Sequence, residues 1–263
     1  MPNVRAHGNS PYTTAVIHGG PGAVGEMAPV ARELSRQAGI LEPLQSAETL
    51  DGQVEELRAQ LEEHAAQPVT LIGYSWGAWL AWITAGRYPR LVRRLVLVSS
   101  PPFDEHYAGQ ITAARLRRLT PRERNEWQAL NAALAEPARA DADTLLARLG
   151  ELASKADSFD PFPADYEAAD RAAPNGRMYT AVWEAAANLR RDGSLLEWAA
   201  EIRCPVTAIH GDHDPHPAEG VRAPLAARLA DFRFILLRQC GHTPWREKRA
   251  RSLFFEVLRR EMG

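Results

Sequence analysis

One short stretch of the chain has the pattern of a serine nucleophile. Residues 73–77 read GYSWG, which matches the GxSxG nucleophile elbow, and they follow a predicted strand and precede a predicted helix. The turn at such a serine is sharp and strained, so glycines are needed two residues before and after it, where side chains would collide. The pattern therefore predicts that Ser75 acts as a nucleophile at the end of a strand.

A serine nucleophile needs a base, and position along the chain favours one of the eight histidines. His242 lies in CGHTPW, in the loop directly after the last predicted strand. Because the carboxyl ends of parallel strands meet at one edge of a sheet, we expect His242 to share that edge with Ser75. His7 and His64 are predicted at the surface, and His106 at the start of a helical segment.

An acidic residue that orients the histidine is expected in the loop after the preceding strand. That loop reads HGDHDPH and contains two candidates, Asp212 and Asp214. Asp104, in the loop after an earlier predicted strand, is a third candidate. The residues alone leave the choice among these three open.

The histidines of the same loop raise the alternative of a transition-metal site. His210, His213 and His216 are interspersed with two aspartates, and imidazole and carboxylate groups are common zinc ligands. Ligands crowded into so short a turn cannot all point at one centre. We therefore expect neither a metal nor a cofactor.

The elements that must position these residues alternate between short apolar runs and amphipathic stretches, an order typical of βαβ units and a parallel sheet. The expected strands are residues 13–17, 40–44, 69–72, 95–98, 205–209 and 232–237. The expected helices are residues 26–37, 50–65, 76–88 and 218–229, followed by a last helix with an apolar face of Leu253, Phe254, Val257 and Leu258. The fold class is thus α/β, with a mostly parallel sheet of roughly six strands flanked by helices.

The segment 103–200 interrupts this alternation and is rich in Ala, Leu, Arg and Glu, which predicts helices. Thr120, Pro121 and Glu123 form a helix-start signal, with a capping hydroxyl and a proline at the first helical position. We interpret 103–200 as a helical cap, or lid, inserted into a core formed by residues 1–102 and 201–263. Such a cap is expected over the carboxyl edge of the sheet, where open α/β sheets bind ligands.

Four motifs together resemble those of the α/β-hydrolase superfamily: HGGPG, GYSWGA, GDHDPHP and CGHTPW, in this order. HGGPG also resembles the prolyl-iminopeptidase branch. The resemblance implies a catalytic triad of Ser75, Asp214 and His242, because the family pattern of glycine, two residues and aspartate ends at Asp214. It also implies an oxyanion hole made by the backbone N–H groups of Gly20 and Trp76.

Two departures from the family pattern affect the expected sheet and substrate. The chain begins almost directly at the strand before HGGPG, so we expect the leading antiparallel strands of the family to be missing and the sheet to be smaller. Tyr74 stands where the peptidase branch has a glycine, and Glu184 weakly matches a lid carboxylate that binds a substrate amine in that branch. We assign Tyr74, Glu184 and Trp245 as substrate-binding residues.

The implied reaction is cleavage of a small ester, thioester or amide through an acyl-enzyme. One alternative is a proline iminopeptidase-like aminopeptidase. An alternative from another class is a non-catalytic small-molecule binder on the same scaffold. The oligomeric state is left open.

The bulk composition limits the partners and the location. A formal charge of −2 with dispersed Lys and Arg gives no basic stripe, which argues against a nucleic-acid partner. No signal-peptide core opens the chain, so we expect a cytoplasmic protein. The charge-free stretch 65–86 has the length of a membrane span, but its turn-forming residues predict a strand, a turn and a helix instead.

Overall fold

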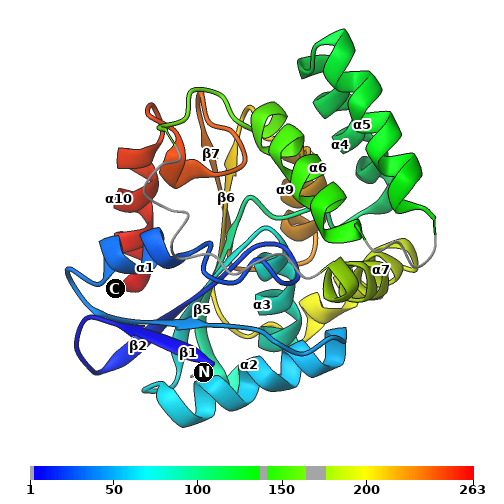
Figure 1. Ribbon diagram of the computed structural model, residues 1–263. Helices are drawn as coiled ribbons and strands as arrows, with labels where there is room; N and C mark the ends of the chain where they lie inside the picture. Colours follow the sequence, from blue (N-terminus) through cyan, green and yellow to red (C-terminus); the bar gives the residue numbers. More distant parts are fainter. Residues whose placement is uncertain (1–2, 137–140, 164–175) are drawn as a thin grey trace.

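A seven-stranded sheet forms the centre of the protein, in the strand order β1-β3-β2-β4-β5-β6-β7. The computed structural model describes residues 3–136, 141–163 and 176–263 (Figure 1). Every neighbouring pair of strands is parallel except β1 and β3. The strands are β1 (Val4–His7), β2 (Tyr12–Ile17), β3 (Gly39–Pro43), β4 (Val69–Tyr74), β5 (Val92–Val98), β6 (Val206–Gly211) and β7 (Phe232–Leu237).

The α/β class and the six expected strands are confirmed, but the expectation that the leading antiparallel strands are missing was wrong. Strand β1 pairs antiparallel with β3, with Val4 opposite Pro43 and His7 opposite Ile40. Its four residues are mostly half-buried and show no apolar run. The strand therefore depends on backbone hydrogen bonding to β3, and its residue types give little indication of it.

Alternating side chains of the strands point to opposite faces of the sheet and build two separate cores. Leu95 and Leu97 belong to a cluster with residues of α2 (Leu50–His64), α3 (Trp76–Arg87) and α9 (Glu219–Ala226). Val96 and Val98 belong to a second cluster with α1 (Ala28–Leu34) and α10 (Arg251–Met262). Figure 1 shows α1 and α10 on one side of the sheet and α2 and α3 on the other.

The chain between β5 and β6 is helical where it is described. The predicted start at Thr120 is present as a capping box, with the hydroxyl accepting from the N–H of Glu123 and the glutamate accepting in return. Residues 137–140 and 164–175 of the expected cap lie outside the described residues. The described helices here are α4 (Ala108–Arg118), α5 (Pro121–Leu134), α6 (Ala142–Asp157), α7 (Gly176–Arg191) and α8 (Ser194–Glu197). The 3-10 turns within the described residues are η1 (Pro89–Leu91), η2 (Glu105–Tyr107), η4 (Trp198–Ala200) and η5 (Pro244–Arg246).

The charge-free stretch 65–86 forms strand β4, a turn and most of helix α3, as predicted. Both elements are buried inside the protein. Among the described residues, no helix combines the length and apolar character that crossing a bilayer requires.

Candidate active site

Ser75 lies in a strained turn between the end of β4 and the start of α3. Its φ of 51° and ψ of −119° fall outside the regions that a non-glycine residue ordinarily occupies. Its N–H donates to the carbonyl of Val98 at the end of β5, which fixes the turn to the neighbouring strand. Tyr74 and Trp76 on either side are buried, whereas Ser75 stays partly exposed. The turn therefore presents the Ser75 hydroxyl at the carboxyl edge of the sheet.

Both glycines of the GYSWG motif are required by close backbone approach. A Cβ on Gly73 would lie 2.1 Å from the carbonyl oxygen of Gly77, so the helix could not turn back against its strand. A Cβ on Gly77 would lie 2.4 Å from the carbonyl oxygen of His18 in the HGGPG loop. This second contact places the HGGPG loop directly beside the first turn of α3.

A chain of hydrogen bonds connects Ser75, His242 and Asp214. The Ser75 Oγ is 3.1 Å from Nε2 of His242, and Nδ1 of His242 is 2.8 Å from Oδ2 of Asp214. A carboxylate only accepts hydrogen bonds, so Nδ1 of His242 carries the proton and Nε2 faces the serine hydroxyl as an acceptor. The three residues come from loops after β4, β6 and β7, which meet at one edge of the sheet.

The two rival aspartates have other partners. Asp212 accepts from the backbone N–H of Cys240 at 3.3 Å and lies 3.6 Å from Arg238, so it joins the β6 loop to the β7 loop. Asp104 accepts from the N–H of His106 and caps a 3-10 turn. Of the three candidate acids, Asp214 is the one whose carboxylate faces His242.

Asp214 is surrounded by two further histidines. Nδ1 of His216 is 2.8 Å from Oδ1 of Asp214, and Nε2 of His210 is 3.5 Å from Oδ2. The side chain of Asp214 has no solvent exposure, and His210 and His216 are buried as well. The carboxylate is therefore enclosed by imidazole groups.

These contacts shift the pKa values of the cluster in different directions. Burial opposes ionisation of Asp214, but His242, His216 and His210 hold the pKa of its carboxyl well below the ordinary range. Burial would lower the pKa of His242, yet the charge of Asp214 and the hydrogen bond to it raise that pKa above its ordinary value. Burial lowers the pKa of His216 to about 4, against the attraction of Asp214. The result is an ionised acid beside one basic and one neutral imidazole.

Asp214, His216 and His242 also have the composition of a metal-binding group, with potential ligand atoms within 4.8 Å of one another. The Nδ1 atoms of His216 and His242, however, each lie 2.8 Å from a carboxylate oxygen of Asp214, which is a hydrogen-bond distance. Ligands arranged tetrahedrally around zinc lie roughly 3.3 Å apart, so a metal would have to break this packing. His213, part of the metal alternative, instead packs its ring against Phe159.

Comparison with known proteins gives the family. The sequence profile described as alpha/beta hydrolase fold matches residues 1–245. The chain belongs to this family. No curated protein sequence matches the chain significantly.

Solved structures resemble this α/β-hydrolase over nearly its whole length. The structure of VinJ has a TM-score of 0.67 at 18% identity, covering 99% of this chain and 95% of that one. E-2-(acetamidomethylene)succinate hydrolase has a TM-score of 0.63 at 17% identity, covering 98% and 93%. The monoacylglycerol lipase of Paleococcus ferrophilus has a TM-score of 0.61 at 14% identity, covering 98% and 96%. At these identities the likeness establishes a shared fold.

Two residues expected at the substrate have buried side chains. Trp245 is fully buried, with its ring centroid 4.6 Å from that of Tyr74 and edge-on to it, so its indole is part of the packed interior. Tyr74 is buried too, donates or accepts a hydrogen bond with Thr243, and lies 5.1 Å from the ring of His242. Tyr74 therefore contacts the histidine loop, residues 238–243, which carries His242, and Trp245 packs against Tyr74. A role of either side chain in substrate binding stays a prediction.

The indole of Trp76 is equally enclosed. It donates from Nε1 to Gln53 on α2 at 3.0 Å, so only the backbone of Trp76 is a candidate for contact with substrate. Gly20, its expected partner in the oxyanion hole, is partly exposed and has a φ of 37°. Glu184 is exposed on α7.

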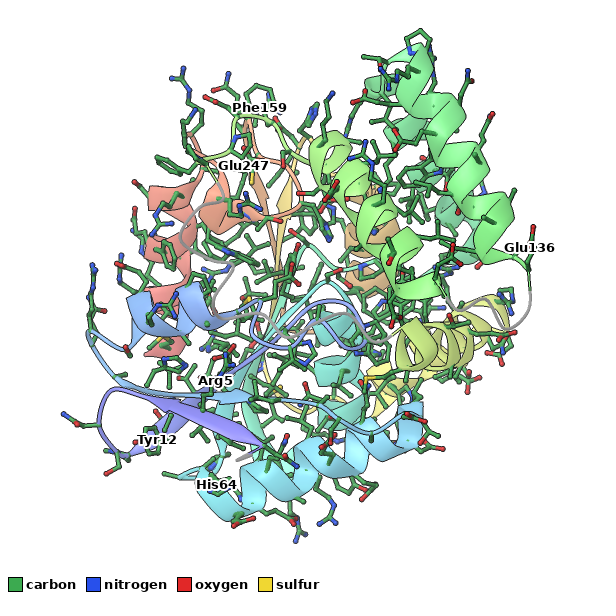
Figure 2. The ribbon with its side chains drawn as sticks, in the orientation of Figure 1. Arg5, Tyr12, His64, Glu136, Phe159 and Glu247 are labelled. Atoms are coloured by element: carbon green, nitrogen blue, oxygen red, sulfur yellow. The ribbon has the colours of Figure 1, made fainter. Side chains whose placement is uncertain are left out.

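Glu247 was missed by the sequence analysis, although it connects α6 to the histidine loop. Its buried carboxylate accepts from the backbone N–H groups of Phe159 and Asp160 at 2.8 Å and of Gly241 at 3.0 Å. Figure 2 shows Phe159 beside Glu247, just past the end of α6. A lone glutamate in a loop gives no sequence signal, because its partners are backbone groups far along the chain.

Asp157 makes a second connection between the same segments. Its carbonyl accepts from the backbone N–H of His242 at 2.8 Å. Its buried carboxylate accepts from Nε and Nη2 of Arg115 on α4, at 2.8 and 2.7 Å. The position of the histidine therefore depends on helices α4 and α6 as well as on the sheet.

Replacing Glu247 with glutamine is expected to lower the free energy of unfolding by about 2–3 kcal/mol, because an amide donor would face backbone donors and charge-assisted hydrogen bonds would be lost. Urea denaturation measures this change. Glu256→Gln, at an exposed position on α10, is the matched control and should shift stability by less than about 0.5 kcal/mol. Equal stability of the two variants would contradict the stabilising role of the Glu247 hydrogen bonds.

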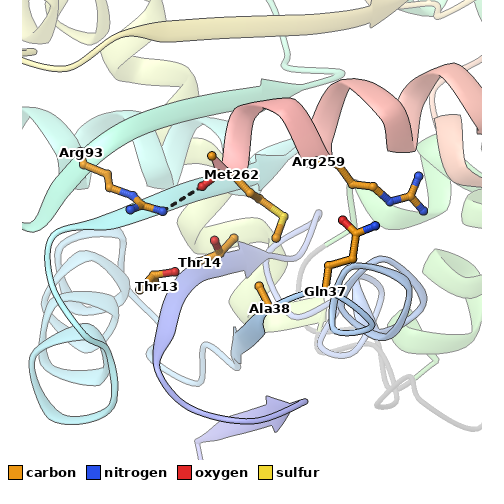
Figure 3. Close-up of a pocket in the computed structure, with 8 residues that line it drawn as sticks. Thr13, Thr14, Gln37, Ala38, Arg93, Arg259 and Met262 are labelled. Atoms are coloured by element: carbon orange, nitrogen blue, oxygen red, sulfur yellow. Dashed lines mark hydrogen bonds between the residues drawn. The ribbon is translucent and has the colours of Figure 1, made fainter.

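A cavity of about 310 Å³ lies at the opposite edge of the sheet (Figure 3). It is lined by Thr14 near the start of β2, Arg93 near the start of β5, and Arg259 and Met262 of α10. Arg93 donates to the carbonyl of Met262 at 3.0 Å. Because these are the amino ends of the strands, this cavity is separate from the site at Ser75.

Proposed function

We propose that this α/β-hydrolase is a serine hydrolase that cleaves a small ester through an acyl-enzyme. The observation that supports it is the hydrogen-bonded path from Ser75 Oγ to His242 Nε2 at 3.1 Å and from His242 Nδ1 to Asp214 Oδ2 at 2.8 Å. In this proposal Ser75 is the nucleophile, His242 the general base and Asp214 the residue that orients and stabilises the imidazole.

The first half of the reaction forms the acyl-enzyme. His242 Nε2 takes the proton as Ser75 Oγ attacks the ester carbonyl, and the carbonyl electrons move to oxygen. The N–H groups of Gly20 and Trp76 are the proposed donors to this oxyanion, each contributing roughly 3 kcal/mol in comparable sites. The imidazolium then gives its proton to the leaving alkoxide, and the alcohol departs.

The second half returns the free enzyme. His242 takes a proton from water as the water oxygen attacks the acyl carbonyl, and the proton passes to Ser75 Oγ when the carboxylic acid leaves. The charge of Asp214, buried beside Nδ1, stabilises the imidazolium in both halves.

The segment 103–200 is proposed to be the cap over this site. At the end of α6, the carbonyl of Asp157 accepts from the N–H of His242, and the N–H of Phe159 donates to Glu247. On α7, Trp183 stacks on Trp79 of α3, with ring centroids 5.6 Å apart and an interplanar angle of 8°. Trp79 lies one helical turn after Ser75, so the cap packs against the helix that carries the nucleophile.

An ester is favoured over an N-terminal proline peptide as the substrate. Glu184, the residue proposed to bind a substrate amine, is exposed on α7 and so provides no enclosed carboxylate. One structural relative is a monoacylglycerol lipase, and a monoacylglycerol is an ester.

Three probes on the wild-type enzyme test the proposal. We expect hydrolysis of p-nitrophenyl butyrate with a kcat/KM on the order of 100-fold above that for L-proline p-nitroanilide, and labelling by a fluorophosphonate. A preference for the proline anilide would replace the esterase by an aminopeptidase. Absence of both turnover and labelling would favour a non-catalytic binder.

A further inference from the structure

The acid of the proposed triad is held by two imidazoles, one at each carboxylate oxygen. His242 donates from Nδ1 to Oδ2 and His216 donates from Nδ1 to Oδ1, each at 2.8 Å. The two rings stack, with centroids 4.4 Å apart and an interplanar angle of 28°. His216 thus contacts both Asp214 and His242, although no step of the proposed reaction uses it.

The backbone of His216 is fixed on both sides. It lies between Pro215 and Pro217, which restrict its backbone and leave few conformations for the loop. Its carbonyl accepts from Nε2 of His210 at 2.8 Å, and its own N–H donates to Oδ1 of Asp214 at 2.9 Å. The ring of His216 is therefore held in one place before any substrate binds.

The charge state of His216 decides what it can do for the pair. Its burial disfavours a charge, Asp214 favours one, and His242 and Arg115 oppose one, with a resulting pKa of about 4. When His216 is neutral, the negative charge of Asp214 stabilises the protonated form of His242 alone. Asp157 also favours protonated His242, and Arg115 opposes it. A protonated His216 stacked on His242 would instead repel the positive charge that His242 gains when it accepts the Ser75 proton.

We propose that His216 is a positioning residue, a neutral imidazole whose Nδ1–H holds Asp214 with Oδ2 turned to His242 and whose ring covers one face of His242. This inference rests on the proposed serine-hydrolase function. Without the Nδ1–H, the one remaining donor to Oδ1 among the described residues is the backbone N–H of His216. The carboxylate can then rotate, and His242 spends less time in the orientation that faces Ser75.

Two substitutions separate the hydrogen bond from the ring packing. His216→Phe keeps a ring on His242 but removes the donor, so kcat for p-nitrophenyl butyrate and the rate of fluorophosphonate labelling should fall about tenfold with KM unchanged. His216→Asn places an N–H the same number of bonds from the backbone as Nδ1, and should restore both rates to within about threefold of wild type. Wild-type rates in His216→Phe would overturn the proposal. So would equal losses of rate in His216→Phe and His216→Asn when both variants are folded.

Nitrogen-15 NMR of the histidine rings tests the same proposal on the unmodified enzyme. His216 is expected to remain a neutral Nδ1–H tautomer from about pH 5.5 to 8. An Nε2–H tautomer, or protonation within this range, would overturn the proposal even if a variant failed to fold. A wild-type enzyme that hydrolyses no ester and is not labelled would refute the proposed function, while the NMR result would still report on His216.

Discussion

Replacing Ser75 with alanine is expected to lower kcat for p-nitrophenyl butyrate by about 10⁵-fold or more and to abolish fluorophosphonate labelling. The reason is that Ser75 Oγ faces His242 Nε2 at 3.1 Å, and in the proposed mechanism it is the atom that bonds to the acyl group. The residual rate would come from the remaining donors and from binding. Steady-state kinetics with an active-site titration measures the loss.

Ser99 offers a matched control for that substitution. It follows β5, next to β4 in the sheet, and like Ser75 it has a positive φ, here 48°. It is fully buried, and within the described part of the chain its hydroxyl has no hydrogen-bond partner. Ser99→Ala should therefore retain activity within about threefold, as is usual where no interaction is lost. Activity of Ser75→Ala close to that of Ser99→Ala would contradict the assignment of the nucleophile.

The second large effect is expected from Asp214→Asn, which should lower kcat by about 10⁴-fold. The Nδ1–H groups of His216 and His242 donate to different oxygens of the Asp214 carboxylate, and asparagine has an oxygen at only one of these two positions. The amide N–H would favour the tautomer of His242 that places its proton on Nε2, facing Ser75, and this tautomer cannot act as a base.

The pH profile gives an independent measure of the same change. His242 must be neutral to accept the Ser75 proton, and its pKa lies above the ordinary value of 6.5. The rate of the wild-type enzyme should therefore fall with decreasing pH, with a midpoint above 6.5. In Asp214→Asn the attraction of the carboxylate is gone and burial dominates, so the midpoint should move to lower pH.

Asp212→Asn is the matched control for this prediction, because the two aspartates lie two residues apart in one loop. Asp212 accepts from the N–H of Cys240 at 3.3 Å, which the amide oxygen of asparagine can still do. We expect a loss of less than about fivefold and an unchanged pH midpoint. A larger loss in Asp212→Asn than in Asp214→Asn would show that the acid has been assigned to the wrong aspartate.

The sequence by itself determined the features that rest on local patterns. Apolar runs alternating with amphipathic stretches predicted the parallel sheet, since a strand and a helix each impose their own period on buried side chains. The GYSWG pattern predicted the turn at Ser75, because close approach of α3 to β4 leaves no room for a Cβ at either glycine. The position of His242 after the last strand predicted that it lies at the same edge of the sheet as Ser75.

Only the tertiary structure decided which side chains face one another across the loops. It turned Asp214 rather than Asp212 toward His242, added β1 to the sheet, and buried Trp245 in the core. It also brought His216 onto Asp214 and Glu247 onto the end of α6. The physical reason is common to all of these: hydrogen bonds between distant segments depend on side-chain directions that the packing of the loops sets, and no local period encodes them.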